Sequence, residues 1–123
     1  MRDVVLSTVD IPNRDAVAAT FGRHDDVAVQ LSGFVEVPAD GEYTFYTESD
    51  DGSLLYIGDW LVLNNDGSHG MFEKGESLAL KKGKHRLRLL YYQGHGDGGL
   101  KLSWSGPNVP KQIIPESALS HPE

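Results

Sequence analysis

Two adjacent aspartates, Asp50 and Asp51, are the residues of this 123-residue sequence that most directly suggest chemistry. Two carboxylates packed together repel each other unless a cation lies between them. Calcium suits such a pair, because it takes about six to eight hard oxygen ligands in flexible geometry. On a regular strand, however, neighbouring side chains point to opposite faces and would not hold one ion. Aspartate followed by glycine also favours turns, so a solvated turn without any ion remains the alternative from the residues alone.

Three other segments carry side chains that could contact a ligand. His95 lies in a glycine-rich run at residues 94–99, where contact with a ligand is plausible. Residues 64–69 offer oxygen ligands at alternating positions but lack the distal glutamate of a calcium-binding loop. We expect that loop to shape the fold, with lining of the ligand site as the alternative. Trp60 could stack on a sugar ring, although tryptophans within strands, such as Trp104, more often fill the core.

Composition excludes several classes of function. The sequence has no cysteine, so thiolate metal sites, cysteine nucleophiles and disulfides are absent. Its 11 Lys and Arg against 18 Asp and Glu give a net charge of −7, which argues against a nucleic-acid-binding surface. The five histidines lack the spacing of a zinc site, and neither a hydrolase elbow nor a phosphate-binding glycine loop is present. We therefore expect a protein that is not an enzyme.

The strands that must position these residues follow from alternating hydrophobicity. Residues 27–37 place apolar side chains at every second position, and residues 42–47 combine aromatic and β-branched side chains. The turn residues 38–41 between them predict a β-hairpin. A second hairpin is predicted from residues 54–57 and 60–63, because Gly58-Asp59 fits a two-residue turn.

The rest of the chain adds strands and little helix. Residues 78–80, 85–92 and 100–104 predict three further strands, a possible strand lies near residues 113–114, and residues 13–19 predict a turn or two of helix capped by Asn13. Many short strands at this spacing favour one all-β domain over residues 1–123, an antiparallel sandwich or barrel. No apolar run approaches the roughly 20 residues that span a bilayer, and the first residues lack the apolar core of a signal peptide.

The order of several motifs resembles the family of protective-antigen fourteen-kilodalton-type domains. This family is named for anthrax protective antigen and also occurs in yeast flocculins, adhesins and glycosidases. The resemblance is strongest over residues 27–115. It is carried by Gly33 to Pro38, Gly41 to Phe45, Ser49 to Ile57, Lys82 to His85, and Leu100 to Trp104, with Ile114-Pro115 closing the pattern. One departure is the order Gly58-Asp59, where many members have Asp-Gly, and either order makes a tight turn.

The resemblance implies a β-sandwich or jelly-roll-like barrel whose ligand loops lie at one end. In flocculin-like members an adjacent aspartate pair, joined by a cis peptide, binds calcium, which in turn binds sugar hydroxyls. Asp50 and Asp51 match that pair by position. A later loop in those members adds an amide side chain and backbone carbonyls, and residues 94–99 correspond to it here. The resemblance therefore makes Asp97 a possible third metal ligand.

These observations together predict a calcium-dependent glycan-binding module. We expect Asp50, Asp51 and Asp97 at the metal, with Trp60 and His95 as further ligand contacts. We expect a monomeric module of a larger exported adhesin or carbohydrate-active protein, at the cell surface, outside the cell or in the periplasm, with its export signal outside this chain. The alternative is a structural or protein-interaction spacer without affinity for sugar.

Overall fold

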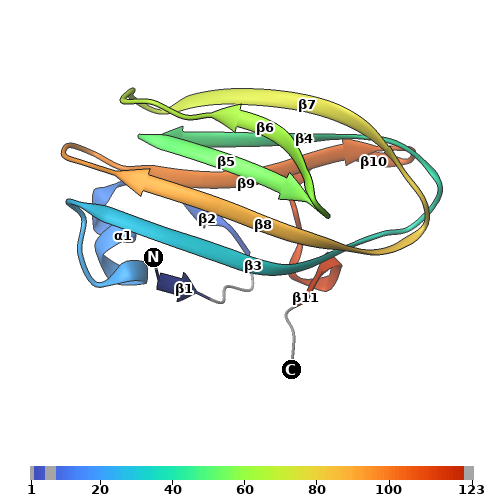
Figure 1. Cartoon of the computed structure of the whole chain (residues 1–123), viewed down its shortest axis with the longest axis horizontal. Helices are drawn as coiled ribbons and strands as arrows, with labels where there is room; N and C mark the ends of the chain where they lie inside the picture. The colour runs from blue at the N-terminus through green and yellow to red at the C-terminus, as the bar shows by residue number, and fades with distance from the viewer. Residues whose placement is uncertain (1, 5–7, 121–123) are drawn as a thin grey trace.

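The chain folds into a sandwich of two β-sheets (Figure 1), seen in a computed structural model that describes residues 2–4 and 8–120. The elements in chain order are β1 (Arg2–Val4), β2 (Asp10–Ile11), α1 (Arg14–Phe21), β3 (Val27–Val37), β4 (Gly41–Asp50), β5 (Gly52–Ile57), β6 (Trp60–Asn65), β7 (Phe72–Leu80), β8 (Gly83–Gln93), β9 (Gly99–Gly106), β10 (Val109–Ile113), the 3-10 helix η1 (Glu116–Ala118) and β11 (Leu119–Ser120). The predicted all-β class is therefore confirmed.

Each sheet collects strands from distant parts of the sequence. The first sheet has the order β1-β3-β8-β5-β6, with β11 also paired to β3. The second has the order β10-β9-β4-β7, with β2 also paired to β9. All pairs are antiparallel except β1 with β3. Over the described residues the sheets stay separate and do not close into a barrel, so the sandwich is the correct form of the prediction.

Alternate side chains of both sheets form the core between them. On β3 the apolar positions 27, 29, 31, 35 and 37 are all buried, as their spacing predicts. The facing sheet contributes Tyr43, Phe45 and Trp104, with the rings of Tyr43 and Trp104 stacked 6.0 Å apart. Trp104 therefore fills the core, in line with the expectation from its place in a strand.

The predicted helix is present and longer than expected. Asn13 caps α1, because its side-chain oxygen accepts a hydrogen bond of 3.0 Å from the backbone N–H of Ala16. The helix ends at Gly22, which has a φ of 87° and so adopts a left-handed conformation that favours glycine. No helix within residues 2–4 and 8–120 is both long and apolar enough to cross a membrane.

The prediction of a hairpin between residues 27–37 and 42–47 is wrong. β3 and β4 lie in different sheets, with β3 paired to β8 and β4 paired to β7 and β9. Turn residues at 38–41 reverse the chain direction in a hairpin and in a crossing between sheets alike. Here they lead from β3 in the first sheet to β4 in the second. The second hairpin is confirmed, since Ile57 pairs with Trp60 and Gly58 has a φ of 62°.

Candidate functional site

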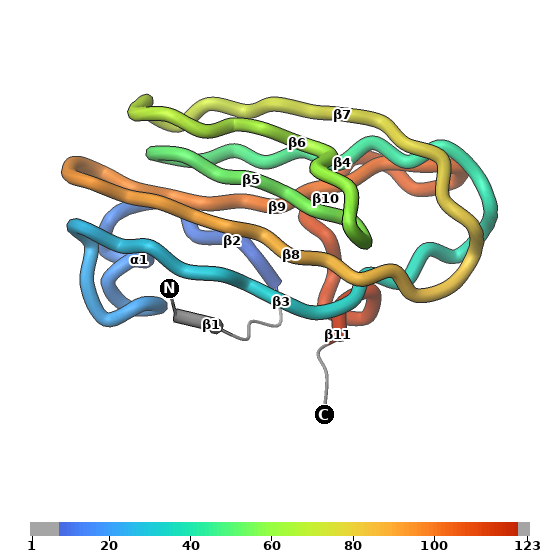
Figure 2. The backbone as a smooth tube through the Cα atoms, viewed as in Figure 1, coloured from blue at the N-terminus to red at the C-terminus, as the bar shows by residue number. Residues whose placement is uncertain are grey.

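Two chain crossings between the sheets meet at one end of the sandwich. The β4–β5 junction leaves the second sheet at Asp50, which pairs with Gly99, and enters the first sheet at Gly52, which pairs with Tyr92. The β8–β9 loop makes the opposite crossing beside it (Figure 2). The two segments that the sequence singled out, the aspartate pair and the glycine-rich loop, are therefore neighbours.

The peptide bond between Asp50 and Asp51 is cis. Both residues are nearly enclosed, with exposed fractions of 8% and 6%. The Asp51 carboxylate accepts two backbone hydrogen bonds, one of 3.2 Å from the N–H of His69 and one of 2.8 Å from the N–H of Gly94. This carboxylate is thus held between the β6–β7 loop and the β8–β9 loop.

The electrostatic environment of Asp50 disfavours its charged form. Burial raises the pKa of Asp50, and the negative charge of the adjacent Asp51 raises it further. A backbone N–H of Gly98 donates to the Asp50 carboxylate and works in the opposite direction, whereas the charge of Asp97 adds to the rise. A cation at this position would relieve the repulsion between the carboxylates.

Tyr91 ties the aspartate pair to the start of β9. Its buried hydroxyl donates a hydrogen bond of 2.7 Å to the backbone oxygen of Asp50 and accepts one of 3.1 Å from the N–H of Gly99. Burial raises the pKa of Tyr91 to about 12, so the hydroxyl stays protonated and remains a donor at neutral pH.

Gln93 is a residue of the candidate site that the sequence analysis missed. It is fully buried, and neither its Oε1 nor its Nε2 has a hydrogen-bond partner among the described residues. The amide lies against Gly98, where an added Cβ would come within 3.3 Å of Nε2. The alternation on β8 contained the signal, because positions 87, 89 and 91 face inward and position 93 continues this face with a polar side chain.

The donor set fits a hard cation such as calcium. It has two adjacent, nearly buried carboxylates, and the buried amide of Gln93 at the same end of the sandwich has no hydrogen-bond partner among the described residues. Within the described part of the chain, no group of three His, Asp or Glu side chains converges as a metal-ligand cluster. An ion here would therefore be held by the carboxylates of Asp50 and Asp51 and by neutral oxygen atoms, without a third converging carboxylate among the described residues.

The β6–β7 loop lies beside the pair, so the alternative that it lines the site has structural support. The side chain of Asn65 donates to the backbone oxygens of Thr47 and Phe72, which anchors the loop to the sandwich. The ring of His69 contacts the carbonyl oxygens of Asn65 and Gly70 at 3.0 Å and 2.8 Å. Burial lowers the pKa of His69, but these carbonyl oxygens and the negative charges of Asp51 and Asp50 together outweigh burial, so the pKa is raised.

The other predicted ligand residues lie at different distances from the aspartate pair. Asp97 is exposed in the β8–β9 loop, close enough to affect the charge of Asp50. His95 is exposed in the same loop, with Nδ1 3.8 Å from a carboxylate oxygen of Asp25. Trp60 is 73% exposed at the turn of the β5–β6 hairpin, the full length of β5 away from Gly52. The structure therefore does not bring Trp60 together with the aspartate pair.

Comparison with known proteins assigns a family. The family model described as the PA14 domain matches residues 5–118. The anti-sigma-I factor RsgI3 of Acetivibrio thermocellus is 35% identical over 96 residues, which are 77% of this chain and 15% of that protein. The chain thus spans only a small part of this curated relative.

Solved structures share the fold. A protein described as an anti-sigma factor domain-containing protein superposes with a TM-score of 0.87 at 29% identity, covering 96% of this chain and 41% of the other. A PA14 sugar-binding domain from an RTX adhesin superposes with a TM-score of 0.74 at 20% identity, covering 94% and 72%. The resemblance read from the sequence motifs is confirmed by these matches.

Proposed function

Since the chain belongs to the PA14 domain family, we propose that it is a calcium-dependent carbohydrate-binding module of a larger exported protein. The observation that carries this proposal is the nearly buried Asp50-Asp51 pair, whose Asp51 carboxylate accepts a hydrogen bond from Gly94, the residue after the unpartnered Gln93. A solved relative of the same fold is a sugar-binding domain, which agrees with this reading.

In this proposal Asp50 and Asp51 supply carboxylate oxygens to the ion, and Gln93 supplies its amide oxygen. Asp97, at the rim, adds negative charge and is a candidate for a further ligand. Bound calcium can leave coordination positions open for two neighbouring hydroxyls of a sugar. The backbone N–H groups of His69 and Gly94 would hold the Asp51 carboxylate in place before and after binding.

The module would bind without catalysing a reaction. Sugar hydrolysis needs two carboxyl groups on opposite sides of the scissile bond. The two nearly buried carboxylates here are instead neighbours on a single crossing between sheets.

For the parent protein we propose a surface-exposed sensor or adhesin. The similarity to anti-sigma factors over nearly the whole module supports a role as a sensor. In such a sensor, glycan binding outside the cell would be signalled to the inside of the cell. The similarity to an adhesin domain supports the second setting.

The proposal is tested by calcium titration in a calorimeter together with thermal melts in calcium and in EDTA. A ligand that binds only the folded state adds about 2.7 kcal/mol of stability at a concentration one hundred times its Kd. We expect this stabilisation in the wild type and its loss in Asp50→Asn and Asp51→Asn. Asp59→Asn, at the exposed β5–β6 turn, is the matched control and should behave as the wild type.

Sugar binding is then measured on a glycan array in calcium and in EDTA. Glycan binding that survives both EDTA and Asp51→Asn would refute the calcium-dependent mechanism. No calcium heat and no glycan binding would instead favour the structural spacer.

A further inference from the structure

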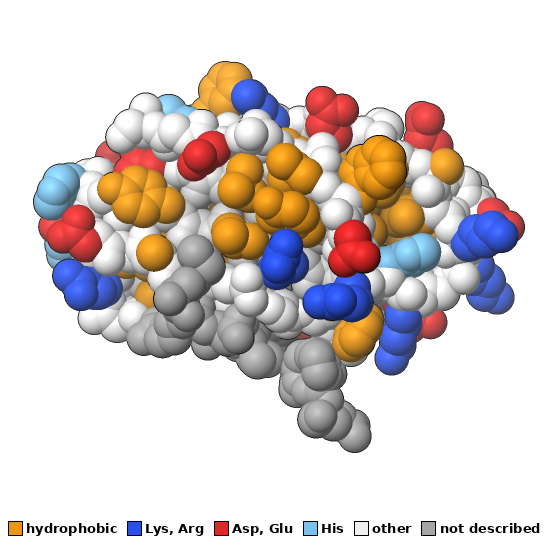
Figure 3. All heavy atoms as spheres, in the orientation of Figure 1, with side chains coloured by type: hydrophobic (Ala, Val, Ile, Leu, Met, Phe, Trp, Pro, Cys, Tyr) orange, Lys and Arg blue, Asp and Glu red, His pale blue; other side chains and the backbone are white. Residues whose placement is uncertain are grey.

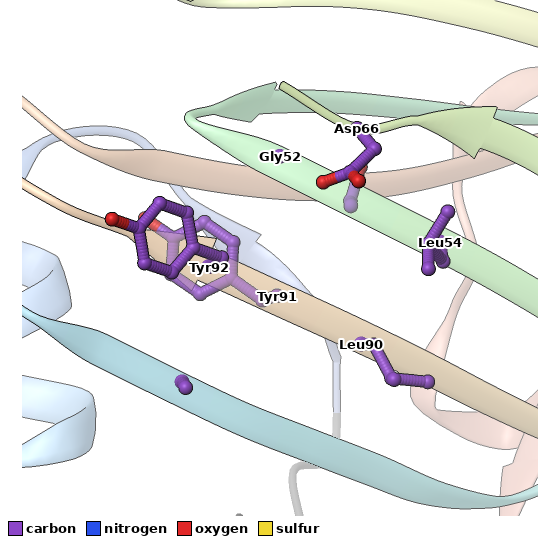
Figure 4. A pocket seen from close by; sticks show the side chains of 8 residues that line it. Gly52, Leu54, Asp66, Leu90, Tyr91 and Tyr92 are labelled. Atoms are coloured by element: carbon purple, nitrogen blue, oxygen red, sulfur yellow. The ribbon is translucent and has the colours of Figure 1, made fainter. Parts of the chain in front are cut away.

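A groove of about 200 Å³ lies on the outer face of the first sheet, next to the aspartate pair (Figure 4). Its apolar lining comes from the middle of β5 and the end of β8, with Leu54 and Leu90 beside Tyr92. Figure 3 shows hydrophobic side chains gathered over the middle of this face. Asp66, from the start of the β6–β7 loop, is the one charged residue of the lining.

The groove is open because the cross-strand neighbours of Tyr92 are small. Tyr92 pairs with Ala28 on β3 and with Gly52 on β5, and directly opposite residues of paired strands share a face. Neither neighbour can cover the ring of Tyr92, which is 48% exposed. At Gly52 an added Cβ would come within 2.6 Å of the Asp66 carboxylate, so the missing side chain also makes room for Asp66.

The groove adjoins the candidate ion site. Gly52 directly follows Asp51, whose backbone N–H donates to the backbone oxygen of Tyr92 at 3.2 Å. An added Cβ at Gly94 would lie 2.9 Å from the hydroxyl oxygen of Tyr92 and 3.5 Å from Oδ2 of Asp51. The tyrosine hydroxyl and the Asp51 carboxylate thus flank the same glycine.

The lining matches a sugar ring in its chemistry. A pyranose has an apolar face of C–H groups, which can lie on Leu54, Leu90 and the ring of Tyr92, and a rim of hydroxyl groups. Asp66 can accept hydrogen bonds from those hydroxyls, whereas it would repel a carboxylate on the sugar. Pockets of this composition, largely apolar with few polar groups, are typical of small-ligand sites.

We propose that this groove binds the second unit of an oligosaccharide, an uncharged pyranose, while the first unit occupies the calcium site. This inference rests on the proposed function of the Asp50-Asp51 site. The module would then recognise glycan chains rather than single terminal sugars, with Tyr92 and Asp66 as specificity residues.

The test compares the affinities of monosaccharides with those of their disaccharides, neutral and uronate-containing, chosen from the array and measured by calorimetry in calcium. We expect the wild type to bind the neutral disaccharide about tenfold more tightly than its monosaccharide, a difference of about 1.4 kcal/mol. Tyr92→Ala should reduce this ratio to about one and leave monosaccharide binding unchanged. Tyr92→Phe should preserve the ratio, because it keeps the ring.

Trp60→Ala is the matched control, since it removes another exposed aromatic side chain from the same sheet without touching the groove. Asp66→Asn should weaken the neutral disaccharide and admit the uronate-containing one. An unchanged ratio in Tyr92→Ala, or equal binding of neutral and uronate disaccharides by the wild type, would overturn the inference while calcium-dependent monosaccharide binding remained. Absence of all calcium-dependent sugar binding would instead refute the proposed function itself.

Discussion

Replacing Tyr91 by phenylalanine should weaken both the fold and the candidate ion site. The change removes one hydroxyl and leaves the backbone oxygen of Asp50 and the N–H of Gly99 without their buried partner. Each buried polar group left unsatisfied costs about 1–3 kcal/mol, so we expect a loss of about 2–4 kcal/mol in the free energy of unfolding. For a domain of this size that corresponds to a fall of about 10 °C in Tm.

The chain offers a control for the ion site in Tyr43, a second buried tyrosine whose hydroxyl bonds to the backbone. Its buried hydroxyl also bridges two backbone groups, donating to the oxygen of Ala39 at 2.7 Å and accepting from the N–H of Ala39 at 3.3 Å. Ala39 lies in the β3–β4 connection, at the other end of β4 from Asp50. Tyr43→Phe should cost less stability, because the backbone groups of the exposed Ala39 can bond to water, and it should not affect the ion site.

The assay is denaturant unfolding for stability and calorimetry for calcium affinity, both well below the Tm of the weaker variant. We expect calcium affinity to fall in Tyr91→Phe and to stay at the wild-type value in Tyr43→Phe. Equal losses of affinity in both variants would show that general loosening of the sandwich is responsible. A stability change below about 0.5 kcal/mol in Tyr91→Phe would refute the assigned role of the hydroxyl.

Three further changes probe the same end of the sandwich. Burial and the charge of Asp51 raise the folded-state pKa of Asp50 above its ordinary value of 3.8. The protonated carboxyl of Asp50 therefore contributes to the free energy of unfolding below pH 3.8, and this contribution is lost as the pH rises through the raised pKa. Without calcium, Asp50→Asn should therefore have a higher Tm than the wild type at pH 7, and this advantage should vanish in melts below pH 3.8; a lower Tm at pH 7 would contradict the argument. Gln93→Leu replaces an unpartnered buried amide by an apolar group, so thermal melts should show higher stability in EDTA and a smaller gain from calcium. Gly98→Ala meets a φ of 75° and contacts of 3.1 Å to Val17, and denaturant unfolding should show a loss of about 1–2 kcal/mol.

Much of the local structure could be predicted, because it depends on neighbouring residues. The alternation in residues 27–37 determines which side chains of β3 are buried, and Gly58-Asp59 determines a tight turn whichever strands surround it. Asp50 and Asp51 stand out in the sequence as two adjacent acids, which are costly if they are buried together, and their role in binding stays a prediction.

The missed features depend on long-range pairing. Residues 38–41 have the same turn chemistry in a hairpin as in a crossing between sheets, so the sheet assignment of β4 cannot be read from them. β7 begins at Phe72 rather than at residue 78, because this edge strand pairs only with β4 and exposes most of its side chains, which removes the alternation. The burial of Gln93 depends on the β8–β9 loop, whose Gly98 lies against its amide, and sequence spacing does not show that contact.

The pairing of early strands with late ones has a consequence for how the chain acquires its structure. β3 pairs along its whole length with β8, and β4 pairs with β9, so the first long strands have their central partners more than 40 residues downstream. Contacts between residues so far apart in the sequence form slowly, because a long loop must close first. A growing or threading chain would therefore hold β3 without its long partner β8, and β4 without β9, until those strands arrive, although β5 can pair with β6 and β4 with β7 before then. The module would complete its folding only after synthesis or export of nearly all its residues.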